Sequence, residues 1–450
     1  MATASASNVL RLPGEGLATG LEQLEWAEVQ KHNTRESSWL VINDQVYDIT
    51  NFGRRHPGGK VIYHYAGQDA TDSFRALHPD SALVMKYLKP LLIGQVAPGS
   101  STAASIVDGA RPAPSAFVEE FRQVRKEFEE QGLFEASWSF FFGMLAHIFL
   151  LEAAAYYSIK LLGNSWPVYL LAVGLLATAQ AQAGWLQHDC GHLSVFRKSK
   201  WNHWMHYIVI CHIKGASRAW WNWRHFEHHA KPNVVRKDPD ITFPNLFLLG
   251  DHLTRKWAKA KKGVMPYNKQ HLYWWAFPPL LLPVYFHYDN IRYVFQHKHW
   301  WDLFWIATFF AKHFTLYGPL MGGWGAFWFY MLVRTVESHW FTWVTQMNHI
   351  PMHVDNDREL DWPTLQGLAT CNVEGSLFND WFTGHLNYQI EHHLFPTMPR
   401  HNYAVANKKV QALYKKHGVP MQTKGLIEAF ADIVKSLEHY GEVWKEAYYG

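Results

Sequence analysis

The hydrophobic positions of this chain are gathered in long runs in its central and later parts. Two apolar stretches, residues 138–162 and 166–186, are separated only by Gly163-Asn164-Ser165. At about 1.5 Å of rise per residue, a helix over the second stretch matches the roughly 30 Å hydrocarbon core of a bilayer. Two further apolar stretches, residues 300–321 and 324–344, meet at a Gly-Gly pair. The pattern predicts about four transmembrane helices.

Another apolar stretch, residues 272–286, is short and contains three prolines, so it predicts an interfacial or re-entrant segment. The long segment between residues 186 and 272 is dense in lysine and arginine, whereas the tight connections between the paired stretches carry none. The positive-inside rule then places this segment and both chain termini in the cytosol. The plainer alternative is that some apolar stretches are buried helices of a soluble protein.

In the first hundred residues, hydrophobic and polar positions instead alternate over short segments. Residues 39–49 predict two short strands joined by an Asn-Asp turn, and residues 70–77 predict a short helix. We expect a compact α+β domain over residues 22–96, preceded by a flexible N-terminus at residues 1–21.

A linker is expected after this domain. Residues 97–116 are rich in Pro, Gly, Ser and Ala and have no hydrophobic period. Residues 117–131 then predict a charged amphipathic helix, which opens an all-α integral membrane domain over residues 117–450. The predicted fold is therefore multi-domain, with a small α+β domain followed by an all-α membrane domain.

The composition excludes several classes of protein. A formal net charge of +4 is too small to indicate a nucleic-acid partner. Three cysteines do not support a disulfide-stapled secreted fold and favour reducing, cytosol-facing surroundings. The unusual number is that of histidine, with 28 residues, which directs attention to metal and haem ligation.

The first specific motif is His56-Pro57-Gly58-Gly59. Proline and two glycines form a tight turn that lets a flat ligand approach the backbone while the imidazole points at it. Bis-histidine ligation of a haem requires a second imidazole, for which His78 is favoured and His64 is the alternative. A histidine in an ordinary surface turn is the structural explanation that competes with this one.

Three histidine clusters lie just outside the apolar stretches, at residues 188–192 (HDCGH), 225–229 (HFEHH) and 389–393 (QIEHH). Each is weak alone, because histidine pairs four residues apart arise by chance, as His349 and His353 illustrate. On a helix, residues i, i+3 and i+4 share one face, so each cluster can direct two or three imidazoles to one point. About eight imidazoles exceed the four ligands of a structural zinc, so two metal ions are expected. A haem donor favours iron, because zinc has no redox chemistry.

Other residues near the clusters have two interpretations. Asp189, Glu227 and Glu391 could orient imidazoles through their second nitrogen or could be exposed spacers. The basic run at residues 255–262 could bind phosphate groups or face anionic lipid. Interfacial anchoring is favoured over the lining of a substrate tunnel for three tryptophans: Trp220, Trp221 and Trp223.

Residues 22–96 resemble the cytochrome b5 family. The resemblance rests on the HPGG motif, on AGQDAT at residues 66–71 and on LIG at residues 92–94. It implies that His56 and His78 are the axial ligands of a haem b.

The chain also resembles the membrane fatty acid desaturases, through the three clusters and the stretches WWNWRHFEHHAKPN, TQMNHIPMH and FNDWFTGHLNYQIEHHLFPTMPRHNY. The fused N-terminal domain and Gln389 at the head of the third cluster are similar to the front-end acyl-CoA desaturases of vertebrates. Gln389 departs from an all-histidine cluster and would be a weak ligand or an outer residue. The resemblance implies two non-haem iron ions, held by His188, His192, His225, His228, His229, His349, His392 and His393.

The same resemblance implies a multi-pass enzyme of the endoplasmic reticulum membrane that uses O2 to insert a cis double bond into a polyunsaturated fatty acyl-CoA. Electrons would come from NADH through cytochrome b5 reductase and then the fused haem. Residues 348–362 favour a delta-5 enzyme that makes arachidonoyl and eicosapentaenoyl products, with a delta-6 enzyme acting on linoleoyl and alpha-linolenoyl chains as the alternative. A diiron lipid hydroxylase, or a membrane electron carrier or metal transporter without enzymatic activity, are the rival hypotheses.

Overall fold

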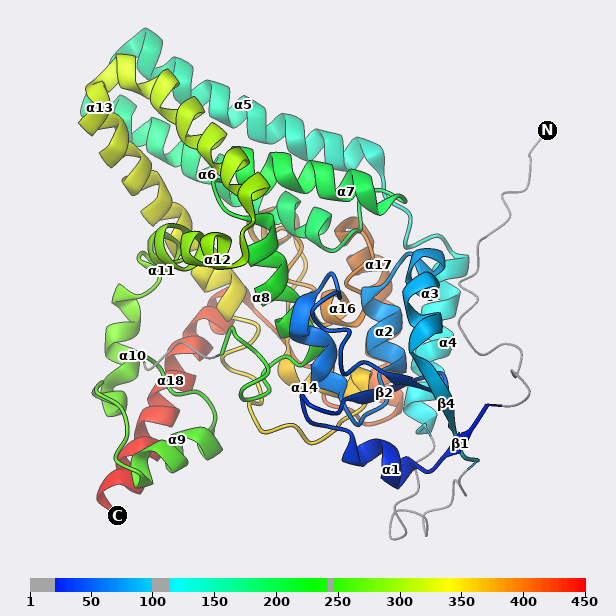
Figure 1. Ribbon diagram of the computed structural model, residues 1–450. Coiled ribbons are helices and arrows are strands. Elements are labelled where there is room, and N and C mark those ends of the chain that lie inside the picture. Colours follow the sequence, from blue (N-terminus) through cyan, green and yellow to red (C-terminus); the bar gives the residue numbers. More distant parts are fainter. Residues whose placement is uncertain (1–20, 99–113, 242–245) are drawn as a thin grey trace, which may run out of the picture.

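The computed structural model describes residues 21–98, 114–241 and 246–450. Nearly all of the expected flexible N-terminus, residues 1–21, and most of the expected linker, residues 97–116, lie outside the described residues. The described chain forms a small α+β unit followed by a large helical unit (Figure 1). This arrangement confirms the predicted fold class.

The N-terminal unit is a small sheet with short helices beside it. Its strand order is β1-β4-β3-β2, and β2 pairs antiparallel with β3. Asn43 and Asp44 connect these two strands with φ of 48° and 63°, a backbone suited to a tight hairpin turn. The hairpin and the helix predicted near residue 70 are both present. The elements are β1 (Gln23–Leu24), α1 (Trp26–Lys31), β2 (Trp39–Ile42), β3 (Gln45–Asp48), η1 (Gly59–Tyr65), α2 (Thr71–Leu77), α3 (Ser81–Leu88), η2 (Lys89–Leu91) and β4 (Leu92–Val96).

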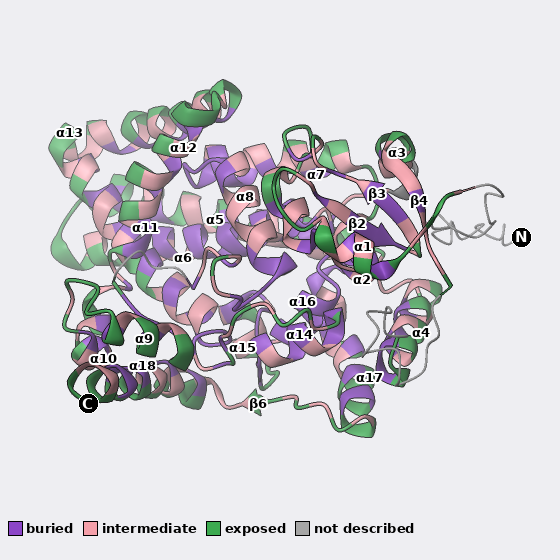
Figure 2. Ribbon diagram, turned by 60° about the horizontal axis from the view of Figure 1, so that its bottom comes forward, coloured by how far each residue is buried: buried purple, intermediate pink, exposed green. Residues whose placement is uncertain are grey.

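The first predicted hairpin of apolar helices consists of α5 (Trp138–Leu162) and α6 (Trp166–Gly191). Gly163 ends α5 with a positive φ of 80°, which makes the sharp reversal possible. Both helices are long and apolar enough to cross a membrane. Helix α5 leaves much of its outer face exposed, whereas α6 is largely buried against its neighbours (Figure 2). Helix α6 also continues five residues past the predicted end at residue 186, and so carries the first histidine cluster.

The second predicted hairpin is α13 (Trp300–Gln346), two helical arms that meet at Gly322. Gly322 has a φ of 77°, and Pro319 lies just before it, so the helix reverses at the predicted Gly-Gly pair. Charged residues such as Lys312 and Arg334 lower the hydropathy of both arms. Among the described residues, only α5 and α6 are apolar enough to qualify as spans on composition. The number of four transmembrane helices therefore stays a prediction.

Residues 272–286 do not form one long helix. The prolines divide them among short elements: the end of α10 (Gln270–Tyr273), η6 (Trp274–Ala276), α11 (Leu281–Val284) and the start of η7 (Tyr285–Asp289). The prediction that this stretch is not a regular span is confirmed.

The predicted amphipathic helix is α4 (Ala116–Glu130), whose apolar face packs Phe121 and Phe128 on Phe395. Shorter helices and strands complete the layer beside the ends of α6 and α13 (Figure 1). They are α7 (Ser199–His206), η4 (Tyr207–Ile213), α8 (Arg218–Ala230), α9 (Asp251–Lys259), η5 (Tyr267–Lys269), α12 (Asn290–His297), α14 (Trp362–Ala369), β5 (Asn372–Val373), α15 (Leu377–Thr383), α16 (Gln389–Leu394), η8 (Arg400–Asn402), α17 (Tyr403–Lys416), β6 (Thr423–Lys424) and α18 (Leu426–Tyr449).

Candidate metal centre

Three helices bring the histidine clusters together. Helix α6 carries His188 in its last turn and has His192 at its C-cap, α8 carries the cluster at residues 225–229, and α16 carries the cluster at residues 389–393. Each cluster spans one helical turn, so its imidazoles leave the helix on one face. The structure places every predicted histidine ligand of the irons in one of two neighbouring groups.

The first group contains five imidazoles whose ligand nitrogens all lie within 4.8 Å of one another: His188, His192, His225, His229 and His392. The Nε2 atom of His225 lies 3.0 Å from that of His188, 2.8 Å from that of His192 and 3.1 Å from that of His229. The Nε2 atom of His392 lies 3.0 Å from that of His229. Many imidazole nitrogens that face one another in a buried space fit a bound cation, to which each can give a lone pair.

The second group contains His228, His349 and His393, again with ligand nitrogens within 4.8 Å. The amide nitrogen of Gln389 lies 2.9 Å from His349 Nε2, while its amide oxygen is buried and has no hydrogen-bond partner in the described structure. The Nε2 atom of His393 is also buried without a partner there. An unsatisfied buried oxygen and an unsatisfied imidazole nitrogen at one point fit a second cation. Gln389 thus lies beside the second group, where an amide oxygen can serve as a weak ligand.

The outer nitrogens of four imidazoles are held by groups around the centre. His228 Nδ1 bonds to the Asp238 carboxylate at 2.8 Å, His392 Nδ1 to the Tyr403 hydroxyl at 2.9 Å and His393 Nδ1 to the Gln366 amide oxygen at 2.9 Å. His349 Nδ1 bonds to a backbone carbonyl, that of residue 369, at 3.2 Å. With Nδ1 held, Nε2 is the nitrogen directed to the cation, which is the usual arrangement at protein metal sites.

These outer partners differ from those considered in the sequence. Asp189 forms an ion pair with Arg400, and Glu391 accepts hydrogen bonds from two asparagine side chains. Glu227 is half-buried; burial raises its pKa, and the Lys60 ammonium of the N-terminal unit opposes this rise. None of these three carboxylates has a hydrogen bond to an imidazole in the described structure, so both interpretations of Asp189 and Glu391 are wrong. No local motif marks the true partners, because chain folding brings them in from other elements.

Burial sets the charge of the centre. Desolvation lowers the pKa of His349 to about 3 and lowers the pKa of His229 and His392 well below the usual value. These imidazoles are neutral at pH 7, which is the form that binds a metal. His228 is the exception, because the Asp238 carboxylate outweighs desolvation and raises its pKa.

We expect Asp238→Asn to weaken metal binding by roughly 10- to 100-fold, the usual effect of losing an outer carboxylate. The amide keeps the size of the side chain but no longer holds the His228 ring with a negative charge. Iron bound per chain, measured against a chelator of known affinity, tests this. The matched control is Asp251→Asn, because Asp251 makes the same kind of bond to exposed His439 at 3.0 Å. Equal iron affinity in both variants would contradict the role given to Asp238.

A central cavity opens onto the centre. Its walls include His188, His225, His228, His349 and Gln389 from the two groups, and most of the remaining lining is apolar or aromatic. Its lining also includes Lys214, whose ammonium is buried and paired with Glu337. Such a cavity suits an apolar chain lying against the metal ligands. Its aromatic walls are Trp185, Trp220, Trp221, Tyr285, Phe286 and Phe341.

Two of the tryptophans expected at the membrane interface therefore line this cavity. Trp220 and Trp221 project from the first turn of α8 into it, whereas Trp223 stacks on Tyr293 with ring centroids 5.0 Å apart. Interfacial anchoring is the wrong interpretation for the first two.

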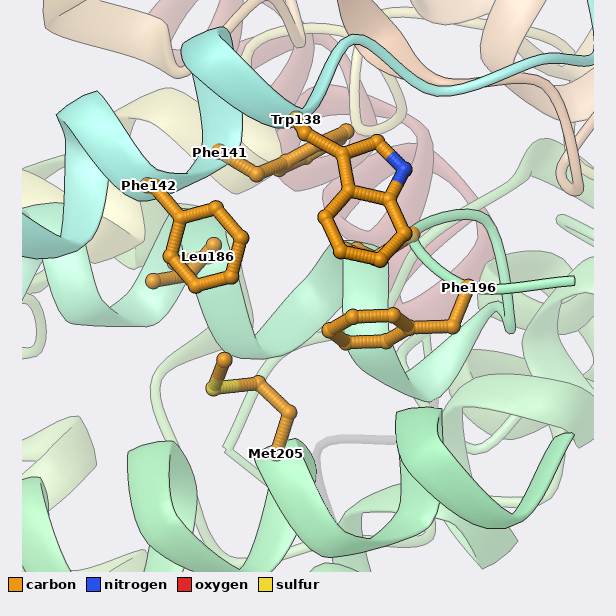
Figure 3. Close-up of a pocket in the computed structure, with 7 residues that line it drawn as sticks. Trp138, Phe141, Phe142, Leu186, Phe196 and Met205 are labelled. Atoms are coloured by element: carbon orange, nitrogen blue, oxygen red, sulfur yellow. The ribbon is translucent and has the colours of Figure 1, made fainter. Parts of the chain in front are cut away.

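A second cavity lies among the start of α5, the last turns of α6, the loop after α6 and helix α7 (Figure 3). None of its lining side chains can ligate a metal as imidazole or carboxylate does. It is a gap in apolar packing and not part of the centre. Its lining consists of Trp138, Phe141, Phe142, Leu186, Val195, Phe196 and Met205.

The N-terminal unit places His56 and His78 close together, with ring centroids 6.0 Å apart and ring planes tilted by 55°. His56 Nδ1 lies 3.2 Å from the Gly59 carbonyl and His78 Nδ1 lies 3.0 Å from the Phe74 carbonyl, so each ring keeps Nε2 for a ligand. Burial lowers the pKa of His56 to about 4, which keeps it neutral. This pair fits bis-imidazole ligation of a haem. His64 makes no ring contact with either histidine in the described structure.

Comparison with known proteins follows the same division of the chain. The family model "Fatty acid desaturase" matches residues 164–425, more than half of the chain. The chain belongs to the fatty acid desaturase family. A second model, "Cytochrome b5-like Heme/Steroid binding domain", matches residues 25–97 of this desaturase. The predicted resemblance to a front-end desaturase with a fused cytochrome b5-like domain is confirmed, and the protein is an oxidoreductase.

Individual relatives agree. The desaturase is 47% identical over 438 residues to the mouse (Mus musculus) "Fatty acid desaturase 2-like protein FADS2B", covering 97% of this chain and 89% of the mouse protein. Among solved structures, "Cytochrome b5 of Ostreococcus tauri virus 2" is 47% identical over 16% of this chain and 82% of its own, with a TM-score of 0.16. His56 and His78 lie within the N-terminal region that the cytochrome b5-like model matches.

Proposed function

We propose that this desaturase is a front-end enzyme that inserts a cis double bond into a polyunsaturated fatty acyl-CoA, with electrons from its own haem domain. The observation that carries the proposal is the pair of imidazole groups at the wall of an apolar cavity. The eight histidines and Gln389 would hold two iron ions, and His56 and His78 would hold haem b. The bound irons supply O2 activation and the removal of hydrogen from an unactivated methylene.

The electron balance of the reaction explains why a haem domain is needed. Two adjacent methylenes lose two hydrogens and form one double bond, which releases two electrons. Reduction of O2 to two water molecules takes four electrons, so two more electrons and two protons must enter. These electrons would come from NADH through cytochrome b5 reductase, by way of the haem that His56 and His78 would hold.

The protein's own residues determine which methylenes react. The cavity would hold the acyl chain against His188, His225 and His349, and its largely apolar walls would limit where the chain can lie. Restricting the chain to one placement is the main catalytic contribution of such walls. Within this proposal, the protein lies in the endoplasmic reticulum membrane with both termini cytosolic, and delta-5 is the favoured position.

Expression in a yeast that lacks polyunsaturated fats tests the proposal. Cells are fed 20:3n-6 and 20:4n-3 in one set of cultures and linoleic and alpha-linolenic acids in another, and double bonds are located by mass spectrometry. We expect arachidonoyl and eicosapentaenoyl products from the first set. New double bonds at the delta-6 position in the products of the second set would show that the enzyme is a delta-6 and not a delta-5 desaturase. Hydroxylated products would make the enzyme a hydroxylase, and absence of any product with about two irons bound would reject the proposal.

A further inference from the structure

Residues 230–238, which include the last residue of α8 and the loop after it, touch both the haem domain and the metal ligands. We name this segment the bridging loop. It begins directly after His229, a ligand of the first group, and ends at Asp238, the carboxylate that holds His228. The 3₁₀ helix η1 of the haem domain lies against α8 just before this loop. The loop is therefore placed where the two redox sites approach each other.

The haem domain is bonded to the start of the loop through Tyr65. The Tyr65 hydroxyl donates to the Ala230 carbonyl at 2.8 Å, and both groups are buried. Ala230 also packs its side chain into the apolar cluster of the haem domain, together with Val61. One hydrogen bond thus connects η1 to the residue that follows His229 in the chain.

Two lysines of the loop add polar bonds to the same domain. Lys231, whose side chain is completely buried, donates to the Gln68 amide oxygen at 2.8 Å and lies 4.4 Å from the centre of the Tyr65 ring. Lys237 donates to the backbone carbonyl of His64 at 2.6 Å. A fully buried ammonium is costly unless it is paired, so these bonds require a carboxylate nearby.

Asp357 provides that carboxylate. It accepts from Lys231 at 3.1 Å, from Lys237 at 2.6 Å and from the amide nitrogen of Gln68 at 3.1 Å. The two lysines outweigh desolvation and hold the pKa of Asp357 below its usual value. This single side chain joins the haem domain, both ends of the loop and the segment that follows His349.

The other face of the loop is fixed to the metal ligands. Asn233 donates from its amide nitrogen to the backbone carbonyl of His349 at 3.0 Å, and its backbone N–H donates to Asp238 at 2.8 Å. Movement of the loop away from the haem domain would therefore disturb His228 and His349 as well.

We propose that the bridging loop, fastened by Asp357, docks the haem domain in the position for electron transfer, and that the bond from Tyr65 to Ala230 is the direct connection to His229. This rests on the proposed function. In each transfer one electron would pass from a ferrous haem held by His56 and His78 to a ferric iron held by the histidine groups, and the reductase would then return the haem to the ferrous state. Tyr65, Lys231, Lys237 and Asp357 are positioning residues, because they touch neither substrate nor metal.

Hydrogen–deuterium exchange on the full-length protein tests the docking without any need for activity. Asp357→Asn should raise exchange of residues 59–68 and 230–238 together by about tenfold, since it weakens the bond to Gln68 and the two ion pairs that hold Lys231 and Lys237 against the haem domain. The matched control is Asp432→Asn, because Asp432 also pairs with two lysines, Lys424 at 2.8 Å and Lys435 at 3.0 Å, away from the haem domain. Lys237→Met should reproduce the effect if Asp357→Asn fails to fold. Unchanged exchange in both Asp357→Asn and Lys237→Met would overturn the docking.

Stopped-flow oxidation of the reduced haem, with iron, O2 and acyl-CoA present, tests the connection. Tyr65→Phe keeps the ring but removes the donor, and we expect oxidation to slow about fivefold, as for the loss of one hydrogen bond of about 1 kcal/mol. Tyr47→Phe is the control, because the Tyr47 hydroxyl bonds to Gln45 inside the haem domain at 2.6 Å. Equal rates in the two variants would reject the connection. Rapid haem oxidation without a desaturated product would instead reject the proposed function and leave the docking in place.

Discussion

Replacement of His349 by alanine is expected to lower desaturase activity by more than about 100-fold, because loss of an outer partner alone costs roughly 10- to 100-fold at metal sites and His349 is placed as a direct ligand. The second group holds only three imidazoles, so removing one leaves two imidazoles and the weak Gln389 oxygen. Iron bound per chain should fall from about two toward one, because five histidines of the first group remain. Iron analysis together with product analysis measures both effects.

His353→Ala is the matched control. His353 lies four residues further along and has the same apparent helical spacing, but its side chain is half exposed and faces Asp355 at 3.5 Å. We expect two irons and unchanged product from this variant. If His353→Ala lost as much iron as His349→Ala, the assignment of the second group would be wrong.

The contrast between these two histidines shows what the sequence could supply. They form one pair at i, i+4, so spacing alone does not say which of them is a ligand. Only the resemblance to known desaturases selected His349. The three clusters could be found because ligands of one helix repeat at i, i+3 and i+4, a periodicity that is local in the chain. That the clusters meet in two groups depends on how α6, α8 and α16 pack, which no local pattern contains.

Outer partners were missed for the same reason. Asp238, Gln366 and Tyr403 belong to no cluster, whereas the carboxylates inside the clusters, such as Asp189, point away from the imidazoles. A helix that directs one face at a metal must direct the residues between its ligands elsewhere. The bonds that orient the ligands therefore come from other segments.

The elements were easier to anticipate than their packing. Gly163 and the Gly-Gly pair at residues 322–323 mark reversals of the chain, since glycine reaches the positive φ that these turns use. The end of α6 was placed too early, because polar residues such as Gln187 and His188 interrupt the apolar run while the helix continues into the metal centre. The sequence alone does not distinguish polar residues that are buried at a functional site from polar residues that end a helix.

The second large effect is expected at the haem. His78→Ala should remove haem binding and with it the Soret absorbance, because a bis-imidazole haem that loses one axial ligand loses half of its protein bonds. Desaturation that depends on NADH should fall to background, while the iron content of the membrane domain stays near two per chain. Absorbance, pyridine haemochrome analysis and iron analysis on one preparation separate the two cofactors.

His64→Ala distinguishes this assignment from the alternative ligand. The His64 ring makes no contact with His56 in the described structure, and Lys237 bonds to its backbone carbonyl, which alanine keeps. This variant should retain haem. Loss of haem from His64→Ala but not from His78→Ala would make His64, and not His78, the second ligand.

His78→Met adds a graded test, because a thioether ligand raises the reduction potential of a haem. Each rise of about 59 mV makes electron transfer to the irons tenfold less favourable. His78→Met should therefore keep its haem reduced during turnover and form product more slowly, which a merely structural role for His78 does not predict.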